Sequence, residues 1–202
     1  MQASSHTPLH TVSWPKERIH PALCGSSRMI QEMFLVKRFN RRIYPSVSAF
    51  IADLKAIMAQ RDQMKPLMRG ELIDTSFRER LMLAVTAVNE CSYCSYAHAR
   101  RALAEGIDSS EVEALQDGVV ENSPREEVPA LLYAQHWAET AGKIDPAARE
   151  RIIETYDEGT VNAIELALRT IQMGNLLGNT MDYVLYRLSF GRLGVSRDVD
   201  SV

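Results

Sequence analysis

Apolar residues recur at helical spacing through most of this 202-residue chain, and this periodicity constrains the fold more than any other feature. Three segments, around residues 47–58, 77–88 and 161–171, carry apolar side chains at positions i, i+3, i+4 and i+7. Each segment therefore predicts a helix with one apolar stripe. Alternating runs of β-branched residues, which are typical of strands, are absent from the sequence. We expect an all-α fold, a compact domain of about seven or eight helices.

Capping and helix-breaking residues indicate where these helices begin and end. Gly106 is a typical helix stop, and Asp108 directly after it is a typical N-cap. Asp145 is followed by a proline, which is favoured at the first helical position. Pro66 falls between two periodic segments, so we expect it to lie outside a helix.

Both ends of the chain lack helical periodicity. Residues 1–27 contain several prolines and serines, which predicts an irregular N-terminal arm. Residues 191–202 predict a polar C-terminal tail. Between these ends we find no repeat and no linker, so we expect one all-helical domain over residues 28–190.

The composition is that of an ordinary soluble globular protein, with 46% hydrophobic residues, 24% charged residues and a formal net charge of −3. This charge gives no reason to expect a nucleic-acid partner, which favours a basic face. No apolar run approaches the ~20 residues of a membrane span, and no signal-peptide core is present. We therefore expect a cytoplasmic protein with no membrane partner.

Two of the three cysteines belong to a motif with the pattern E-x11-C-x2-C-x3-H. Its members are Glu79, Cys91, Cys94 and His98. A helix break is expected at residues 89–90, so Cys91 should lie in the first turn of a second helix. The remaining cysteine, Cys24, lies in the predicted arm and is expected to be a bystander.

The spacing of the motif suits thiol chemistry. Unpaired N–H groups at a helix start favour a thiolate at Cys91, and the i, i+3 spacing allows a disulfide with Cys94. His98 lies one turn after Cys94, where an imidazole can take the thiol proton and later return it. A carboxylate at Glu79 on the preceding helix can orient His98 and fix its tautomer.

Two alternatives to this interpretation stay open at this point. The cysteines can be inert small hydrophobic residues. A zinc site can use Cys91, Cys94 and His98, but a closed site needs a fourth ligand, and only Glu79 is at hand. We expect neither a metal nor another cofactor.

At these four residues the sequence resembles the alkylhydroperoxidase D-like branch of the carboxymuconolactone decarboxylase family. The resemblance extends from about residue 77 to residue 178 and does not include the arm. It implies a homotrimer or homohexamer of all-helical chains. It also implies an oxidoreductase, a two-cysteine peroxidase that acts on a hydroperoxide without metal, haem or flavin and is recycled by a dithiol reductant.

The resemblance also implies a role for each residue of the motif. Cys94 is oxidised to a sulfenic acid, Cys91 is its disulfide partner, and His98 and Glu79 form the proton relay. Helix-terminus electrostatics favour Cys91 as the more acidic thiol, whereas the resemblance and the neighbouring His98 favour attack by Cys94, which we expect. The best-known members have histidine between the two cysteines, and this chain has Tyr93 in that region, which leaves its substrate and reductant open.

Two other functions fit the same motif. A redox sensor or disulfide-exchange protein would use the cysteine pair without fast peroxide turnover. The decarboxylase branch is the second alternative, although the cysteine pair argues against it because that branch lacks the pair.

Two further features lie near the motif or downstream of it. Arg100 and Arg101 follow His98, and we expect them to lie on a solvated helix face. Gly174 and Gly178 have the spacing that lets helices approach closely, and we expect them to serve local packing.

Overall fold

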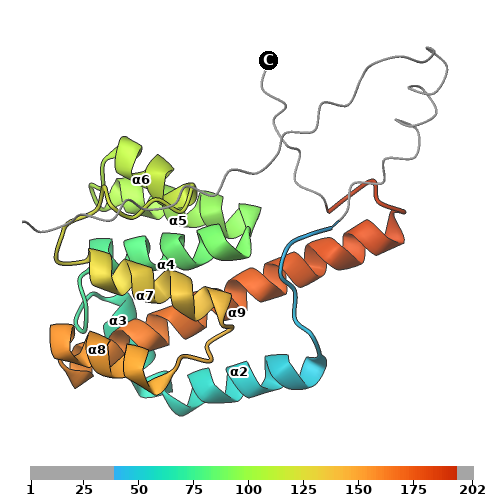
Figure 1. The fold of residues 1–202 in the computed structure, drawn as a ribbon. Coiled ribbons are helices and arrows are strands. Elements are labelled where there is room, and N and C mark those ends of the chain that lie inside the picture. Colours follow the sequence, from blue (N-terminus) through green and yellow to red (C-terminus); the bar gives the residue numbers. More distant parts are fainter. Residues whose placement is uncertain (1–38, 195–202) are drawn as a thin grey trace, which may run out of the picture. The chain divides into compact units, whose positions relative to one another are not determined.

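The computed structural model describes residues 39–194 of the chain. This range contains eight α-helices and no strand, which confirms the all-α prediction (Figure 1). The predicted arm, including Cys24, lies outside the described residues, as do residues 195–202. The helices are α2 (Val47–Ala59), α3 (Arg61–Met68), α4 (Thr75–Asn89), α5 (Ser92–Ala104), α6 (Ser109–Gln116), α7 (Val128–Glu139), α8 (Pro146–Tyr156) and α9 (Glu158–Leu188).

Helix α4 is the centre of the core, and Figure 1 shows the helices that surround it. It packs against α5, α6, α7 and α9, and every residue from Phe77 to Thr86 is buried. The prediction of a single apolar stripe was wrong here because neighbouring helices cover α4 on all sides. The buried run includes three consecutive charged residues, Arg78, Glu79 and Arg80, which must be paired to be tolerated there.

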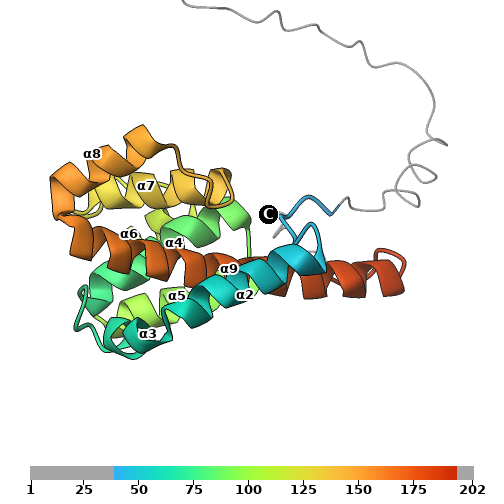
Figure 2. The same ribbon diagram turned by 90° about the horizontal axis from the view of Figure 1, so that it is seen from below.

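Helix α2 differs from α4 in the opposite way, because most of its predicted apolar stripe is exposed. It packs against α9, as Figure 2 shows, but of its apolar residues only Ile57 is buried. Four large apolar side chains on α2 are exposed, namely Val47, Ile51, Leu54 and Met58. Their spacing forms a stripe along the helix, which we call the α2 stripe.

Helix α9 changes character along its 31 residues. Asp157 caps its start by accepting hydrogen bonds from the backbone N–H and the hydroxyl of Thr160. Its first half carries core residues such as Ile164 and Leu168. Its second half exposes apolar side chains, which we call the α9 stripe: Leu177, Met181, Val184, Leu185 and Leu188.

The capping residues behave largely as their types predict. Asp108 and Asp145 are the N-caps of α6 and α8, and Gly106 adopts a left-handed conformation with φ 84° just after α5. Pro66 is an exception, because it lies inside α3 rather than between helices. Because Pro66 has no N–H, it cannot bond to the carbonyl four residues earlier, so this helix of 8 residues lacks one of its backbone hydrogen bonds.

The segment before α2 is fixed to the helices that follow much later in the chain. The Nη1 atom of Arg41 lies 2.8 Å from a carboxylate oxygen of Asp182 on α9. Arg42 donates hydrogen bonds to the carbonyls of Ala138 and Glu139 at the end of α7. Within residues 39–194, each helix is too short or too polar to cross a bilayer.

Candidate functional site

The junction between α4 and α5 carries all four residues of the motif. Helix α4 ends at Asn89, and Glu90 reverses the chain with a left-handed φ of 55°. Cys91 is the N-cap of α5 and not, as predicted, a residue of its first turn. Glu79 lies on α4, while Cys94 and His98 lie on successive turns of α5. All four side chains are buried.

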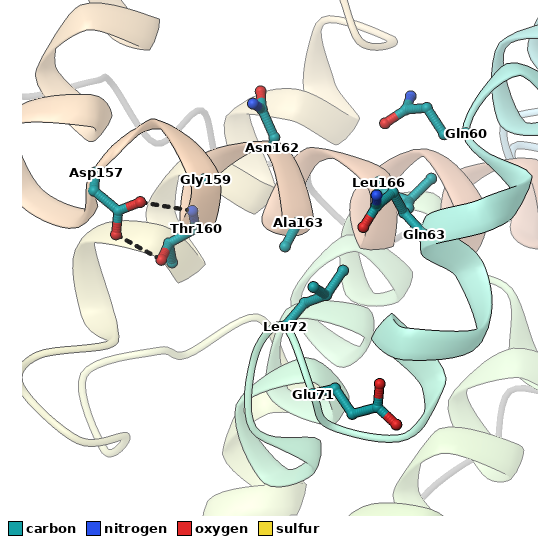
Figure 3. Close-up of a pocket in the computed structure, with 10 residues that line it drawn as sticks. All are labelled: Gln60, Gln63, Glu71, Leu72, Asp157, Gly159, Thr160, Asn162, Ala163 and Leu166. Atoms are coloured by element: carbon teal, nitrogen blue, oxygen red, sulfur yellow. Dashed lines mark hydrogen bonds between the residues drawn. The ribbon is translucent and has the colours of Figure 1, made fainter.

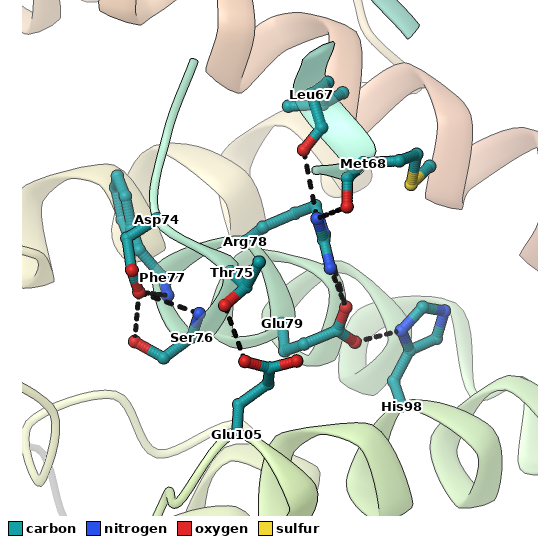
Figure 4. A network of polar contacts seen from close by, with 10 residues as sticks. All are labelled: Leu67, Met68, Asp74, Thr75, Ser76, Phe77, Arg78, Glu79, His98 and Glu105. Atoms are coloured by element: carbon teal, nitrogen blue, oxygen red, sulfur yellow. Dashed lines mark hydrogen bonds and ion pairs between the residues drawn. The ribbon is translucent and has the colours of Figure 1, made fainter. Parts of the chain in front are cut away.

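The Glu79 carboxylate and the His98 ring are in direct contact. The Oε2 atom of Glu79 lies 2.7 Å from Nδ1 of His98 (Figure 4). Glu79 is only 1% exposed and His98 is 8% exposed, so water does not compete strongly for this contact. The structure thus brings together the two residues that were predicted to form a proton relay.

Arg78 is a member of this network that the sequence motif did not identify. Its Nη2 atom lies 2.9 Å from Oε1 of Glu79, and its Nη1 atom donates to the carbonyls of Leu67 and Met68 at 3.0 Å and 2.8 Å (Figure 4). Arg78 therefore holds one carboxylate oxygen of Glu79 and leaves the other for His98. The sequence offered one sign of this role: an arginine stands directly before Glu79, within a segment that is otherwise predicted to be an amphipathic helix.

The electrostatics of Glu79 decide where the His98 proton lies. Burial acts to raise the pKa of the Glu79 carboxyl, but the hydrogen bonds and charges of His98 and Arg78 outweigh it and lower the pKa below its ordinary value of 4.5. Glu79 is therefore an ionised acceptor near neutral pH, and His98 donates its Nδ1–H to it. The Nε2 atom forms no hydrogen bond within the described residues, so it is the ring nitrogen that remains open to a proton donor or acceptor.

The two cysteines of the motif are joined by a disulfide. Their Cα atoms lie 5.3 Å apart, and the Cys91 Sγ atom accepts a hydrogen bond from the backbone N–H of Cys94 at 3.4 Å. A sulfur at this N-cap position faces the positive end of the α5 dipole, which favours a thiolate in the reduced protein. Both residues are buried, with Cys91 2% exposed and Cys94 8% exposed.

Helix α9 forms a polar wall beside the segment that leads into Cys91. Asn179 donates from Nδ2 to the backbone carbonyl of Asn89 at 2.7 Å, and the Asn89 Nδ2 donates to Oδ1 of Asn175 at 3.3 Å. Asn175 also exchanges hydrogen bonds with the hydroxyl of Thr86. These buried residues were not singled out from the sequence. The only sign of them in the sequence was that asparagines interrupt an otherwise apolar helical pattern.

The outward face of α5 is exposed. It is lined by two tyrosines and two arginines, namely Tyr93, Tyr96, Arg100 and Arg101, which border a shallow hollow of about 380 Å³. The Arg100 guanidinium lies over the Tyr96 ring, 5.8 Å from its centroid. Tyr93 is 78% exposed, so it points to solvent rather than towards the buried Glu79–His98 pair.

Residues 39–194 contain no group of three or more histidine, cysteine or acidic residues arranged to hold a metal ion. The sulfurs of Cys91 and Cys94 are bonded to each other, so neither is a thiolate ligand in this state.

A second, larger cavity contains none of the four motif residues. It has a volume of about 730 Å³ and is lined by residues from the α2–α3 junction, the segment before α4 and the start of α9 (Figure 3). Polar side chains such as Gln63, Glu71 and Asn162 form its walls, and Leu72 and Leu166 contribute apolar surface.

Comparison with known proteins agrees with this description of the fold. Residues 55–140 match the model of the carboxymuconolactone decarboxylase family. The structure is similar to the crystal structure of an uncharacterized peroxidase-related protein from Silicibacter sp. TM1040, with a TM-score of 0.52 and 22% sequence identity. The match covers 64% of this chain and 68% of that protein. No curated protein matches the sequence.

Proposed function

Because residues 55–140 match the carboxymuconolactone decarboxylase family, within which this chain resembles the alkylhydroperoxidase D-like branch, we propose that it is a thiol-dependent peroxidase. The observation that carries the proposal is the Cys91–Cys94 pair at the start of α5, with the buried Glu79–His98 contact on the same two helices. The fold neighbour is itself described as peroxidase-related, which agrees with this class of function.

The reaction starts from the reduced pair. The Nε2 atom of His98 accepts the proton of the Cys94 thiol, and Glu79 stabilises the imidazolium that forms. The Cys94 thiolate attacks the distal oxygen of a hydroperoxide, so that an S–O bond forms and the O–O bond breaks. The leaving alkoxide takes the proton from His98 and departs as an alcohol, and Cys94 is left as a sulfenic acid.

The second half of the cycle uses Cys91. Its thiolate attacks the sulfur of the Cys94 sulfenic acid, the S–S bond forms, and the hydroxyl group leaves as water after protonation. An external dithiol, of the kind a reducing cytoplasm would supply, then restores both thiols by exchange and is itself oxidised to a disulfide. We expect the incoming thiolate to attack the sulfur of Cys94, because Cys94 as a residue is 8% exposed and Cys91 only 2%.

The N-cap position of Cys91 leads to a testable assignment of roles. Helix-terminus electrostatics make Cys91 a good thiolate, which suits either the attacking or the resolving role. The neighbouring His98, one turn after Cys94, supports attack on the peroxide by Cys94. We therefore assign peroxide attack to Cys94 and resolution to Cys91.

Titration of free thiols before and after one equivalent of an alkyl hydroperoxide tests the proposal. The fully reduced chain has three cysteines, and we expect the number of free thiols to fall from three to one. In C94S we expect the peroxide to remove no more thiols than are lost in an untreated sample. C91S should stop at a sulfenic acid that a dimedone-type probe traps. An unchanged count in the native protein would overturn the peroxidase proposal, and full turnover by C94S with an inactive C91S would reverse the two roles.

The family match favours lactone decarboxylation as a second candidate. Lactone turnover by the C91S/C94S double variant would support that activity and overturn the thiol mechanism. A redox sensor is separated from an enzyme by steady-state peroxide loss with a dithiol reductant. Oxidation that stops after one turnover, although reductant is present, would indicate the sensor.

We further propose that the chain acts as a homotrimer or homohexamer, as the resemblance implies. The exposed α2 and α9 stripes support this proposal, because large contiguous apolar surfaces on soluble proteins commonly mark contacts between subunits.

A further inference from the structure

Helix α9 comes close to the cysteine pair at Gly178. A Cβ atom at this position would lie 3.2 Å from the Sγ atom of Cys91, which is tighter than nine in ten contacts that real Cβ atoms make. The sulfur therefore occupies space that any other residue at position 178 would fill. Gly174, one turn earlier on the same helix, has no atom within 4 Å of the corresponding position.

The close approach is enforced by hydrogen bonds on either side of Gly178. Asn179 holds the carbonyl of Asn89 at 2.7 Å, and Asn175 accepts from the Asn89 side chain at 3.3 Å. Both asparagines are fully buried, and Asn89 is 1% exposed. The backbone just before Cys91 is thus tied to α9 and cannot retreat freely from a larger residue at position 178.

We propose that Gly178 is a positioning residue that admits the Cys91 sulfur of the disulfide and thereby sets the equilibrium between the disulfide and the dithiol. The inference rests on the proposed function in treating Cys91 and Cys94 as a pair that cycles between these two states. In the disulfide, Cys91 Sγ is bonded at both ends and cannot turn away from α9. In the dithiol, the Cys91 side chain is free to rotate about its Cα–Cβ bond. A methyl group at position 178 should therefore penalise the disulfide more than the dithiol.

The test is the exchange equilibrium with glutathione. Two glutathione thiols reduce the protein disulfide, and the products are the protein dithiol and glutathione disulfide, so one S–S bond breaks and one forms. For G178A we expect the equilibrium to shift towards the dithiol by about tenfold. For G174A, which makes the same chemical change on the same helix in open space, we expect a shift of less than about twofold.

If G178A does not fold in the native background, a variant that lacks the Cys91 sulfur still tests the proposal. In the C91A background the added methyl group has room, so G178A and G174A should change the midpoint of thermal unfolding equally. Equal exchange equilibria for G178A and G174A in the native background would overturn the proposal. The proposal would also be overturned if G178A folded as poorly in the C91A background as it does in the native background.

The exchange measurement contains no peroxide, so its outcome is independent of peroxidase activity. A native protein that consumes peroxide, with G178A unshifted, would overturn the role of Gly178 alone. A native protein that is inert towards peroxide, with G178A shifted, would overturn the proposed function and leave the role of Gly178 supported.

Discussion

Glu79 divides its two carboxylate oxygens between two partners, and this division organises the site at the scale of single residues. Oε1 accepts from Arg78, and Oε2 accepts from Nδ1 of His98. A carboxylate with both oxygens engaged cannot rotate freely, so the His98 ring is held in one orientation. The ring nitrogen that Glu79 does not engage is therefore Nε2.

Replacement of Glu79 by glutamine tests this arrangement. E79Q keeps the shape of the side chain but removes the charge that stabilises the His98 imidazolium. We expect the rate of thiol oxidation by an alkyl hydroperoxide to fall about 100-fold or more, measured on the reduced protein by stopped-flow mixing. E113Q, which changes an exposed glutamate on α6, serves as the matched control. An E79Q rate equal to that of E113Q would contradict the relay.

The lowered pKa of Glu79 also predicts how stability depends on pH. The folded-state pKa lies below the ordinary value of 4.5, so the unfolded chain takes up the proton first as the pH falls. The contribution of Glu79 to stability is complete above about pH 4.5 and is lost as the pH falls through the folded-state value.

The free energy of urea unfolding from about pH 6 to about pH 3 measures this contribution. Asp74, Asp108, Asp145 and Asp157, whose pKa values are lowered mainly by hydrogen bonds at helix N-caps, titrate in the same direction. We therefore expect the free energy of unfolding of E79Q to fall less steeply with decreasing pH than that of the native protein, but still to fall. An identical profile for the native protein and E79Q would contradict the pKa assignment.

At the scale of helices, Arg78 joins two elements that are otherwise connected by a short loop. Its guanidinium lies on α4 and caps the carbonyls of Leu67 and Met68 at the end of α3. The same side chain supports Glu79, so the position of α3 and the orientation of the relay depend on one residue. Helix α3 thus contributes to the site without containing a motif residue.

Removal of the Arg78 charge should destabilise the fold strongly. R78M leaves the buried Glu79 Oε1 and two carbonyls without this donor, so we expect a loss of about 3–5 kcal/mol in the free energy of unfolding, measured by chemical denaturation. R61M removes an arginine on α3 whose side chain is 73% exposed and should change that free energy by less than about 0.5 kcal/mol. A similar loss in both variants would show that the Arg78 contacts contribute little.

Much of the site was predictable because its motif is local in the chain. Glu79 and His98 lie 19 residues apart on consecutive helices, so helical periodicity and a break at residues 89–90 are enough to predict their proximity. The contribution of α9 was not predictable in this way. Asn175 and Asn179 contact a segment 86 to 90 residues earlier, and only the packing of α4 on α9 brings these parts together.

The helices themselves were predicted better than their faces. Caps at Asp108 and Asp145 depend on local chemistry, and they lie where the sequence predicts them. Which side of a helix is buried depends on the neighbours it meets. The apolar stripe predicted for α2 is largely exposed, whereas α4, for which one stripe was also predicted, is buried on all sides.

At the scale of the whole molecule, the exposed apolar stripes are the feature that a single chain does not explain. The α2 stripe and the α9 stripe lie on helices that pack against each other. Exposed apolar surface of this kind commonly marks a contact with another protein. Association of identical chains through these helices would remove that surface from solvent.

Charge on the α9 stripe should lower the oligomeric state. For the native protein we expect three or six chains by size-exclusion chromatography with light scattering, and a smaller assembly for M181E/L185E. L132E, which places the same charge on an exposed leucine of α7, should leave the native mass unchanged. A native monomer, or an M181E/L185E assembly of native size, would contradict a contact through α9.

The short distance between Cys91 and Cys94 has a consequence for the fate of the oxidised protein. Their Cα atoms are 5.3 Å apart in a single turn, so the second thiol reaches the sulfenic acid without any unfolding of α5. In terms of effective concentration, the neighbouring thiol far exceeds any peroxide in solution. Formation of the disulfide should therefore be faster than a second oxidation of the sulfenic acid. The protein should resist conversion to the sulfinic acid even in excess hydroperoxide. The proposed peroxidase should therefore be inactivated slowly, and the reduction of its disulfide should limit its turnover.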